Sequence, residues 1–180
     1  MTFDIASERL TYAKLVPSDW ELIRSIYTNP KLLQHISTLQ SEAAIRNNFE
    51  KELAPWDITS PHWLTWTIRE KASNQQVGVI CIHTHNGEKR TAEVGFILLE
   101  TSAGKGYATE ALKRVMKFAV DTFRFEKFMA VCSEEHIASQ RVLEKVGMTL
   151  DELVPDNTEI EGRMVNDCFY SMEVVGDYES

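Results

Sequence analysis

A regular apolar periodicity near the middle of the chain constrains the fold more than any other feature of this sequence. Apolar residues recur there at intervals of three and four positions: Ala108, Ala111, Leu112, Val115, Met116, Ala119, Val120 and Phe123. This spacing places them along one face of an α-helix. The sequence therefore predicts an amphipathic helix over 108–123 whose apolar face packs against a sheet or another helix.

The loop before this helix contains the tripeptide Gly104-Lys105-Gly106, a few residues after a run that reads as a strand. Glycine lets the backbone present successive N–H groups without obstruction by a Cβ atom. A helix N-terminus adds about half a positive charge, so the turn is suited to phosphate, although an ordinary tight turn has the same pattern. The loop is not a Walker A motif, and Thr109 breaks the dinucleotide-binding pattern, which disfavours ATP hydrolysis and hydride transfer.

The remaining patterns predict three further helices and a set of strands. One helix begins at Pro17, with Ser18 and Glu21 spaced as a capping box, and ends at Asn29-Pro30. Ser41 caps a second helix that Pro55 stops, and a third, compact helix ends at Gly147. Strands are expected at 8–15, 63–69, 76–82, 92–99, 127–132, 148–154 and 167–174, with Asn86-Gly87 as a hairpin signal between two of them.

This order of elements predicts the fold class. Early helices among antiparallel strands are followed by strand–helix–strand–helix–strand, which favours an α/β fold with a mixed, mostly antiparallel sheet. We expect six to seven strands flanked by about four helices. Residues 1–180 contain no internal repeat or Pro/Gly-rich linker, so a single domain is the simplest organisation.

Charge is distributed unevenly along the 180 residues, which carry a net charge of −8. Residues 148–180 hold nine acidic side chains against Arg163 alone, whereas residues 101–127 hold six basic and three acidic ones. Besides ordinary solvated surface, this asymmetry is consistent with an anionic ligand at the basic stretch and a cationic one near the acidic end. The sequence contains no basic cluster with interleaved aromatic residues, the pattern that would indicate nucleic-acid binding.

Other patterns bear on the location of the protein. No apolar run approaches the roughly 18 residues of a membrane helix. The N-terminal residues lack the apolar stretch of a secretory signal. Three scattered cysteines, Cys81, Cys132 and Cys168, suit reduced thiols better than disulfides or a metal site. We therefore expect a cytoplasmic protein with no membrane partner.

Three segments resemble a known family. The runs 92–98, 104–112 and 138–148 are similar to those of the GNAT acyl-CoA N-acyltransferase superfamily, and within it to the RimJ/RimL type of ribosomal-protein N-terminal acetyltransferases. The resemblance implies the single-domain GNAT fold, acetyl-CoA as co-substrate and no metal. It also implies an N-acetyltransferase that transfers acetyl directly to a primary amine, either a protein N-terminus or a small molecule, as a monomer or homodimer.

The resemblance also implies where acetyl-CoA binds. Its pyrophosphate would lie on the amides of the glycine loop, its pantetheine arm along the 94–98 strand, and its thioester near the last helix. The implied binding residues are Phe96, Ile97, Leu98, Ala103, Gly104, Lys105, Gly106, Tyr107, Ala108, Thr109, His136 and Ser139. The chain departs from the family pattern at Thr101, usually Gln or Arg; at His136, usually Asn; and at Leu143, a tyrosine in many relatives.

Candidate catalytic residues follow from the chemistry of amine acylation. An amine with a pKa of about 10 is protonated at neutral pH, so a general base must accept its proton. Glu93 is the first candidate, the alternative being a solvent-facing strand residue. Because Leu143 cannot donate a proton to the CoA thiolate, Ser139 is the best donor; alternatively it satisfies free helix amides.

His136 and Cys132 leave other routes open. His136 could cap the last helix, donate a proton or lie on the surface. Cys132, near His136, is the one arguable nucleophile for a covalent route. Two other functions also stay open: a catalytically silent acyl-CoA-binding sensor or interaction module, and a binder of another nucleotide phosphate.

Overall fold

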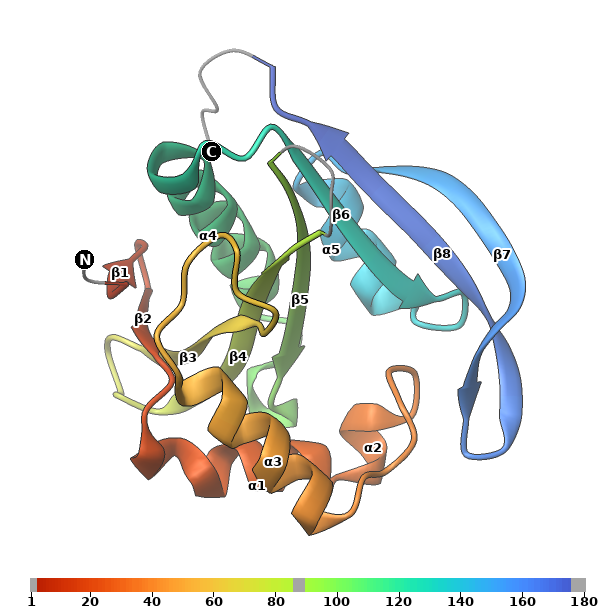
Figure 1. Ribbon diagram of the computed structural model, residues 1–180, viewed down its shortest axis with the longest axis horizontal. Coiled ribbons are helices and arrows are strands. Elements are labelled where there is room, and N and C mark those ends of the chain that lie inside the picture. The colour runs from red at the N-terminus through yellow and green to blue at the C-terminus, as the bar shows by residue number, and fades with distance from the viewer. Residues whose placement is uncertain (1–2, 86–89, 176–180) are drawn as a thin grey trace.

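The computed structural model describes residues 3–85 and 90–175, which form one sheet with helices on both faces (Figure 1). The strands are β1 (Ile5–Ala6), β2 (Leu10–Lys14), β3 (Leu64–Glu70), β4 (Gln76–Thr84), β5 (Thr91–Leu98), β6 (Lys127–Ser133), β7 (Thr149–Ile160) and β8 (Arg163–Glu173). Their order across the sheet is β1-β2-β3-β4-β5-β6-β8-β7. Every neighbouring pair is antiparallel except β5 and β6, which are parallel. The mixed, mostly antiparallel α/β fold is thus confirmed.

Helices cover the two faces of the sheet. They are α1 (Trp20–Tyr27), α2 (Pro30–Leu33), α3 (Glu42–Leu53), α4 (Tyr107–Phe123) and α5 (Ile137–Lys145), with short 3-10 turns at Pro17–Asp19 and Glu100–Ser102. Val94 of β5 and Leu112 of α4 are buried in the larger apolar core, whereas Val79 of β4 packs with Ile23 of α1 and Phe49 of α3 in a second cluster. The first core lies under α4 and α5, and the second lies under α1 and α3 (Figure 1).

The parallel contact between β5 and β6 is short. It contains three residue pairs, and the last of them joins Glu93 to Met129. Beyond it β5 stays paired with β4 as far as Leu98, and β6 stays paired with β8 as far as Ser133. The two strands therefore separate while each remains held on its outer edge, as Figure 1 shows between β5 and β6.

Several local predictions are confirmed. The predicted central helix is α4, and its apolar positions Leu112, Val115 and Met116 are completely buried. The Ser41 side chain caps α3 by accepting a hydrogen bond from the Ala44 N–H at 3.2 Å. Gly147 follows α5 with a φ of 95°, the left-handed conformation that favours glycine there.

The prediction of a capping box formed by Ser18 and Glu21 is wrong. A 3-10 turn precedes α1, and the carboxylate of Asp19, not the Ser18 hydroxyl, accepts a hydrogen bond, from the Val16 N–H at 3.0 Å. Asn29 does more than mark the end of α1. Its side-chain oxygen accepts from the N–H groups of Lys31 and Leu32 and so begins α2, a helix that was not predicted.

The element counts also differ from expectation. The sheet contains eight strands among the described residues, because a two-residue β1 pairs with β2. The last two strands are longer than predicted, since a turn at Glu161 and Gly162, both with positive φ, connects them directly. Asn86-Gly87 lies outside the described residues, although the strands on either side, β4 and β5, are antiparallel. None of the described helices combines the length and apolar character that a membrane span requires.

Gly78 provides a test of how closely β4 and β5 pack. An alanine Cβ there would lie 2.2 Å from the Ile97 carbonyl oxygen, a backbone atom. We expect Gly78→Ala to lower the free energy of unfolding by about 3 kcal/mol, because backbone cannot move aside as a side chain can. Gly95→Ala, whose Cβ would meet the Cys81 thiol at 3.1 Å, is the matched control and should cost about 1 kcal/mol. Urea denaturation measures both, and equal losses would contradict the prediction.

Candidate active site

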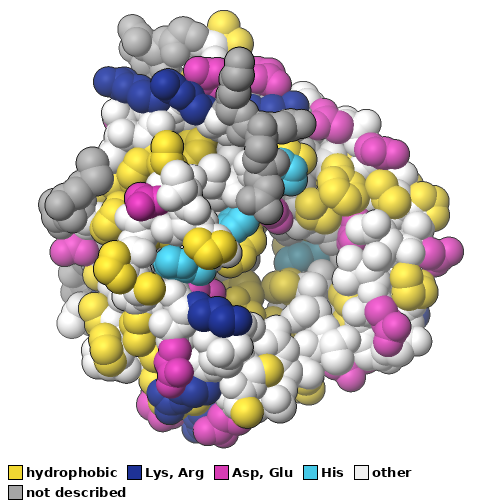
Figure 2. All heavy atoms as spheres, in the orientation of Figure 1, with side chains coloured by type: hydrophobic (Ala, Val, Ile, Leu, Met, Phe, Trp, Pro, Cys, Tyr) yellow, Lys and Arg dark blue, Asp and Glu magenta, His cyan; other side chains and the backbone are white. Residues whose placement is uncertain are grey.

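A cavity of about 610 Å³ opens where β5 and β6 separate. Its walls include Val94–Ile97 from β5 and 130–133 from β6. Ser139 and Leu143 of α5 line it from one face of the sheet, whereas Ile23 of α1 and Phe49 of α3 line it from the other. Figure 2 shows a hollow near the centre of the molecule, bordered by apolar and histidine side chains. The cavity therefore passes through the sheet and connects its two faces.

The glycine loop has a left-handed backbone conformation at both glycines. Gly104 and Gly106 have φ values of 74° and 78°, and Gly106 immediately precedes α4. Gly104, Lys105 and Gly106 are exposed, and a Cβ atom placed on Gly104 would find no protein atom within 4 Å. The first amides of α4, at Tyr107, Ala108 and Thr109, have no carbonyl partner inside the helix. Together these amides form an open, positively polarised turn.

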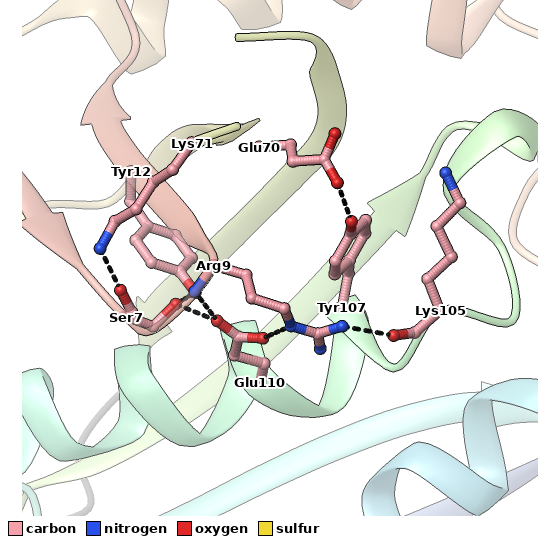
Figure 3. Close-up of polar contacts among 8 residues, drawn as sticks. All are labelled: Ser7, Arg9, Tyr12, Glu70, Lys71, Lys105, Tyr107 and Glu110. Atoms are coloured by element: carbon pink, nitrogen blue, oxygen red, sulfur yellow. Dashed lines mark hydrogen bonds and ion pairs between the residues drawn. The ribbon is translucent and has the colours of Figure 1, made fainter. Parts of the chain in front are cut away.

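A side-chain network from the turn between β1 and β2 contacts this loop (Figure 3). The Arg9 Nη1 donates to the Lys105 carbonyl at 2.9 Å, and its Nε donates to Glu110 Oε2 at 2.7 Å. The Arg9 guanidinium also lies over the Tyr107 ring, 4.7 Å from its centroid. Arg9 thus bridges the loop to the first turns of α4.

Glu110 is the centre of the network. It accepts hydrogen bonds from the Arg9 N–H at 2.8 Å and the Ser7 hydroxyl at 2.6 Å, in addition to the guanidinium. Burial acts to raise the pKa of Glu110, but the hydrogen bonds from Ser7 and Arg9 outweigh it and hold the pKa below its ordinary value. Tyr107 is anchored separately, because its hydroxyl donates to Glu70 (Figure 3). Neither Arg9 nor Glu110 was predicted, since their partners are about a hundred residues away in the sequence.

Glu93 lies at the point where β5 and β6 separate. It is paired with His83 on β4 and Met129 on β6. The carboxylate is half-buried, and this burial raises the pKa of Glu93 despite opposing effects of His83 and His85. Its neighbour Val94 lines the cavity, whereas Glu93 is not among the residues that line it.

Ser139 and Cys132 meet on the α5 side of the cavity. Ser139 is buried in the third position of α5, and both residues line the cavity. Burial raises the pKa of Cys132 to about 12, and a hydrogen bond with Ser139 only partly offsets this. The Cys132 thiol is therefore protonated at neutral pH, which argues against a thiolate nucleophile.

His136 occupies the N-cap position of α5 but does not cap the helix with its side chain. Its carbonyl accepts from the N–H groups of Ser139 and Gln140 instead. The imidazole lines the cavity beside His35, with the ring centroids 5.4 Å apart, and burial lowers the pKa of His136. Of the alternatives left open for His136, the structure excludes side-chain capping, and the half-buried ring lies at the cavity.

Other implied binding residues take different places. Phe96 and Ile97 line the cavity; Leu98 lies beside them at the end of β5, paired with Gly78. Ala103 is exposed just before the glycine loop. Leu143 is buried in the cavity wall, where it offers no proton. Among residues 3–85 and 90–175, no group of three His, Cys, Asp or Glu side chains is arranged to hold a metal ion.

Glu52 of α3 lines the cavity and was not predicted. Its Oε2 accepts a hydrogen bond from the Thr65 hydroxyl at 2.6 Å. Glu52 follows Ile45 and Phe49 at helical spacing, so a charged residue lies on the buried face of α3. That placement is the signal in the sequence that could have identified it.

The acidic C-terminal segment contributes little to the cavity. Among its described acidic residues only Asp167 lines it, and that carboxylate accepts from Asn157 Nδ2 at 2.8 Å and from the Thr158 hydroxyl. The remaining described ones are exposed along β7 and β8. Charge near the acidic end is thus mainly a property of the surface.

Known proteins are similar to this chain in sequence or in fold. The YnaD protein of Bacillus subtilis (strain 168), an "Uncharacterized N-acetyltransferase", is 32% identical over 72 residues, 40% of this chain and 42% of YnaD, so the match spans less than half of that relative. The structure of RimL, a ribosomal L7/L12 α-N-protein acetyltransferase, has a TM-score of 0.81 at 17% identity, covering 97% of this chain and 96% of RimL. Spermidine N-acetyltransferase from Vibrio cholerae, in complex with CoA and spermine, has a TM-score of 0.79 at 16% identity, covering 93% and 96%. The model described as "Acetyltransferase (GNAT) domain" matches residues 9–149, and the chain therefore belongs to the GNAT acetyltransferase family.

Proposed function

We propose that this protein transfers the acetyl group of acetyl-CoA directly to a primary amine that enters the cavity. The observation that carries the proposal is the separation of β5 from β6 after three residue pairs, which opens a strand edge onto the cavity. An extended pantetheine arm carries amide groups that can hydrogen-bond to this edge as a neighbouring strand would. The glycine loop follows the end of β5 and supplies amides for the pyrophosphate.

The residues of this chain would act on the donor in three places. Ala103 to Thr109 would bind the pyrophosphate through the loop and the start of α4. Phe96, Ile97 and Leu98 would hold the pantetheine arm, and backbone N–H groups around Phe96 and Ile97 would stabilise the developing oxyanion. His136 and Ser139 would lie beside the thioester, because both line the cavity on the α5 side.

The reaction that suits these groups is direct attack. The amine nitrogen forms a bond to the thioester carbonyl carbon, the C–S bond breaks, and CoA leaves as a thiolate. Glu93 accepts the amine proton, and its raised pKa keeps it a stronger base than an exposed glutamate. Ser139 donates a hydrogen bond to the leaving thiolate. The alternative of a silent acyl-CoA-binding module predicts CoA binding without turnover.

The acceptor class is also a proposal. The motifs favour the RimJ/RimL type, whose members act on protein N-termini, whereas the enclosed, carboxylate-bearing cavity favours a small amine. A panel of both kinds of acceptor, measured by thiol release, distinguishes them.

Thiol release from acetyl-CoA tests the proposed function together with the glycine loop. Wild-type protein should release CoA thiol with at least one primary amine, and Gly104→Val should lose this activity and at least about tenfold in CoA affinity. The valine branch would occupy the space that phosphate needs.

Gly162→Val is the matched control for this substitution. Gly162 has a φ of 77° and likewise no atom within 4 Å of an added Cβ, but it lies in the β7–β8 turn. It should therefore bear the same backbone strain and keep CoA binding. Binding without thiol release from any amine would support the silent module, and unchanged CoA affinity in Gly104→Val would contradict the loop assignment.

Arg9 should act by positioning the loop. Arg9→Met removes the bonds to the Lys105 carbonyl and Glu110, so we expect the KM for acetyl-CoA to rise about tenfold while kcat stays unchanged. Arg114→Met is the control: it removes the same charge from α4, where Arg114 donates to the Ala6 carbonyl at 2.7 Å. Steady-state kinetics measure the KM of both variants. An equal rise in KM for Arg9→Met and Arg114→Met would show that the loss of a positive charge, and not the loss of the contacts to the loop, weakens binding.

The pH dependence tests Glu93. Wild-type kcat/KM should fall as the pH drops through the raised pKa of Glu93, because the protonated carboxyl cannot accept a proton. Glu93→Gln should reduce kcat/KM about 100-fold near neutral pH, and the deficit should shrink near pH ~10, where the amine is already deprotonated.

Glu126→Gln, at an exposed glutamate 3.8 Å from Arg90, should leave the pH profile unchanged. A deficit for Glu93→Gln that is constant over the whole pH range would exclude Glu93 as the base.

A further inference from the structure

We propose that Glu52 determines acceptor specificity by binding a second cationic group, so that the acceptor class is a diamine or polyamine. This inference rests on the proposed function, in which the reacting amine meets the thioester between β5 and β6. Glu52, which lines the cavity on the α3 side, then binds the second, distal ammonium group of the acceptor.

The sheet register places Glu52 relative to the reaction centre. Its partner Thr65 on β3 is paired with Cys81 on β4, which is paired with Gly95 on β5. Neighbouring strands lie about 4.8 Å apart, so Thr65 is about 10 Å from the strand that would hold the thioester. At this distance the Glu52 carboxylate contacts the far end of an acceptor rather than its reacting nitrogen.

The cavity surface between Glu52 and β5 is mainly apolar. Cys81 lines the cavity and is half-buried; burial raises the pKa of its thiol, and the negative charges of Glu52 and Glu93 add to that rise. In the sheet register Cys81 on β4 lies between Thr65 on β3, which donates to Glu52, and Gly95 on β5, two residues from Glu93. Phe49 and Trp63 also line the cavity and provide apolar contact for methylene groups.

Glu52 forms no ion pair with a lysine or arginine of the described residues, although the positive charge of Lys14 acts on it and lowers its pKa in part. The Nζ of Lys14 donates to the carbonyls of Glu52, Leu53 and Ala54, at 3.4, 3.2 and 3.0 Å, instead of to the carboxylate. No lysine or arginine in the described part of the chain lies within 4.0 Å of the carboxylate oxygens. Burial raises the pKa of Glu52 because it destabilises the charged carboxylate. An incoming ammonium would stabilise that charge.

Matched acceptors of equal chain length test this inference. With acetyl-CoA, wild-type protein should use 1,6-diaminohexane at least about tenfold better in kcat/KM than n-hexylamine. Glu52→Gln keeps the size of the side chain and an oxygen for the Thr65 hydroxyl, and should abolish this preference. Glu50→Gln, at an exposed position on the same helix, removes the same charge and should keep the preference.

Binding separates failure of this inference from failure of the proposed function. Calorimetric titration of 1,6-diaminohexane into the CoA-loaded protein should show affinity at least about tenfold weaker for Glu52→Gln than for wild type, whether or not turnover occurs. Thr65→Val, which removes the donor to Glu52, is the second variant and should weaken binding less.

Equal diamine binding by wild type and Glu52→Gln, or a preference for n-hexylamine or a peptide N-terminus that Glu52→Gln leaves intact, would overturn the inference. Diamine binding that depends on Glu52 in a protein without thiol release would instead overturn only the proposed reaction.

Discussion

The short parallel contact between β5 and β6 is the constraint on which the rest of the site depends. After Glu93 and Met129 the two strands diverge, but each stays in the sheet because β4 holds β5 and β8 holds β6. Backbone polar groups on the facing edges then need another partner. A cavity through the sheet is the consequence, and a strand-like ligand can enter it without breaking any existing ladder.

The glycine loop owes its conformation to local chemistry and its position to distant contacts. Gly104 and Gly106 reach the left-handed region without steric cost. The exposed loop would nevertheless be free to move if Arg9 did not bind the Lys105 carbonyl and Glu110. The opening strands and α4 thus form one unit, and the amides of the loop are ordered before any ligand arrives. Such preorganisation lowers the entropic cost of binding.

The acidic residues of the protein fall into an exposed group and a partly buried group. The described acids of β7 and β8 are mostly exposed, where solvent and salt weaken their interaction with a ligand in the cavity. Glu93 and Glu52 are fewer but partly buried, one at the strand apex and one on α3. A carboxylate removed from water interacts more strongly with an ammonium ion than an exposed one does. In the proposed reaction, these two side chains rather than the net charge would select a cationic acceptor.

By itself the sequence determined the features that depend on neighbouring residues: the α4 face, the Ser41 cap, the left-handed Gly147 and the glycine loop. Each follows from periodicity or from the conformational range of one residue. Tertiary structure decided the rest. Two details that differed from prediction are local exceptions, between residues two or three positions apart: the Asp19 carboxylate accepts from the Val16 N–H, and the Asn29 side chain caps α2. Arg9 and Glu52 gain their roles only when strand register brings residues far apart in sequence together, because a hydrogen bond depends on distance in space and not along the chain.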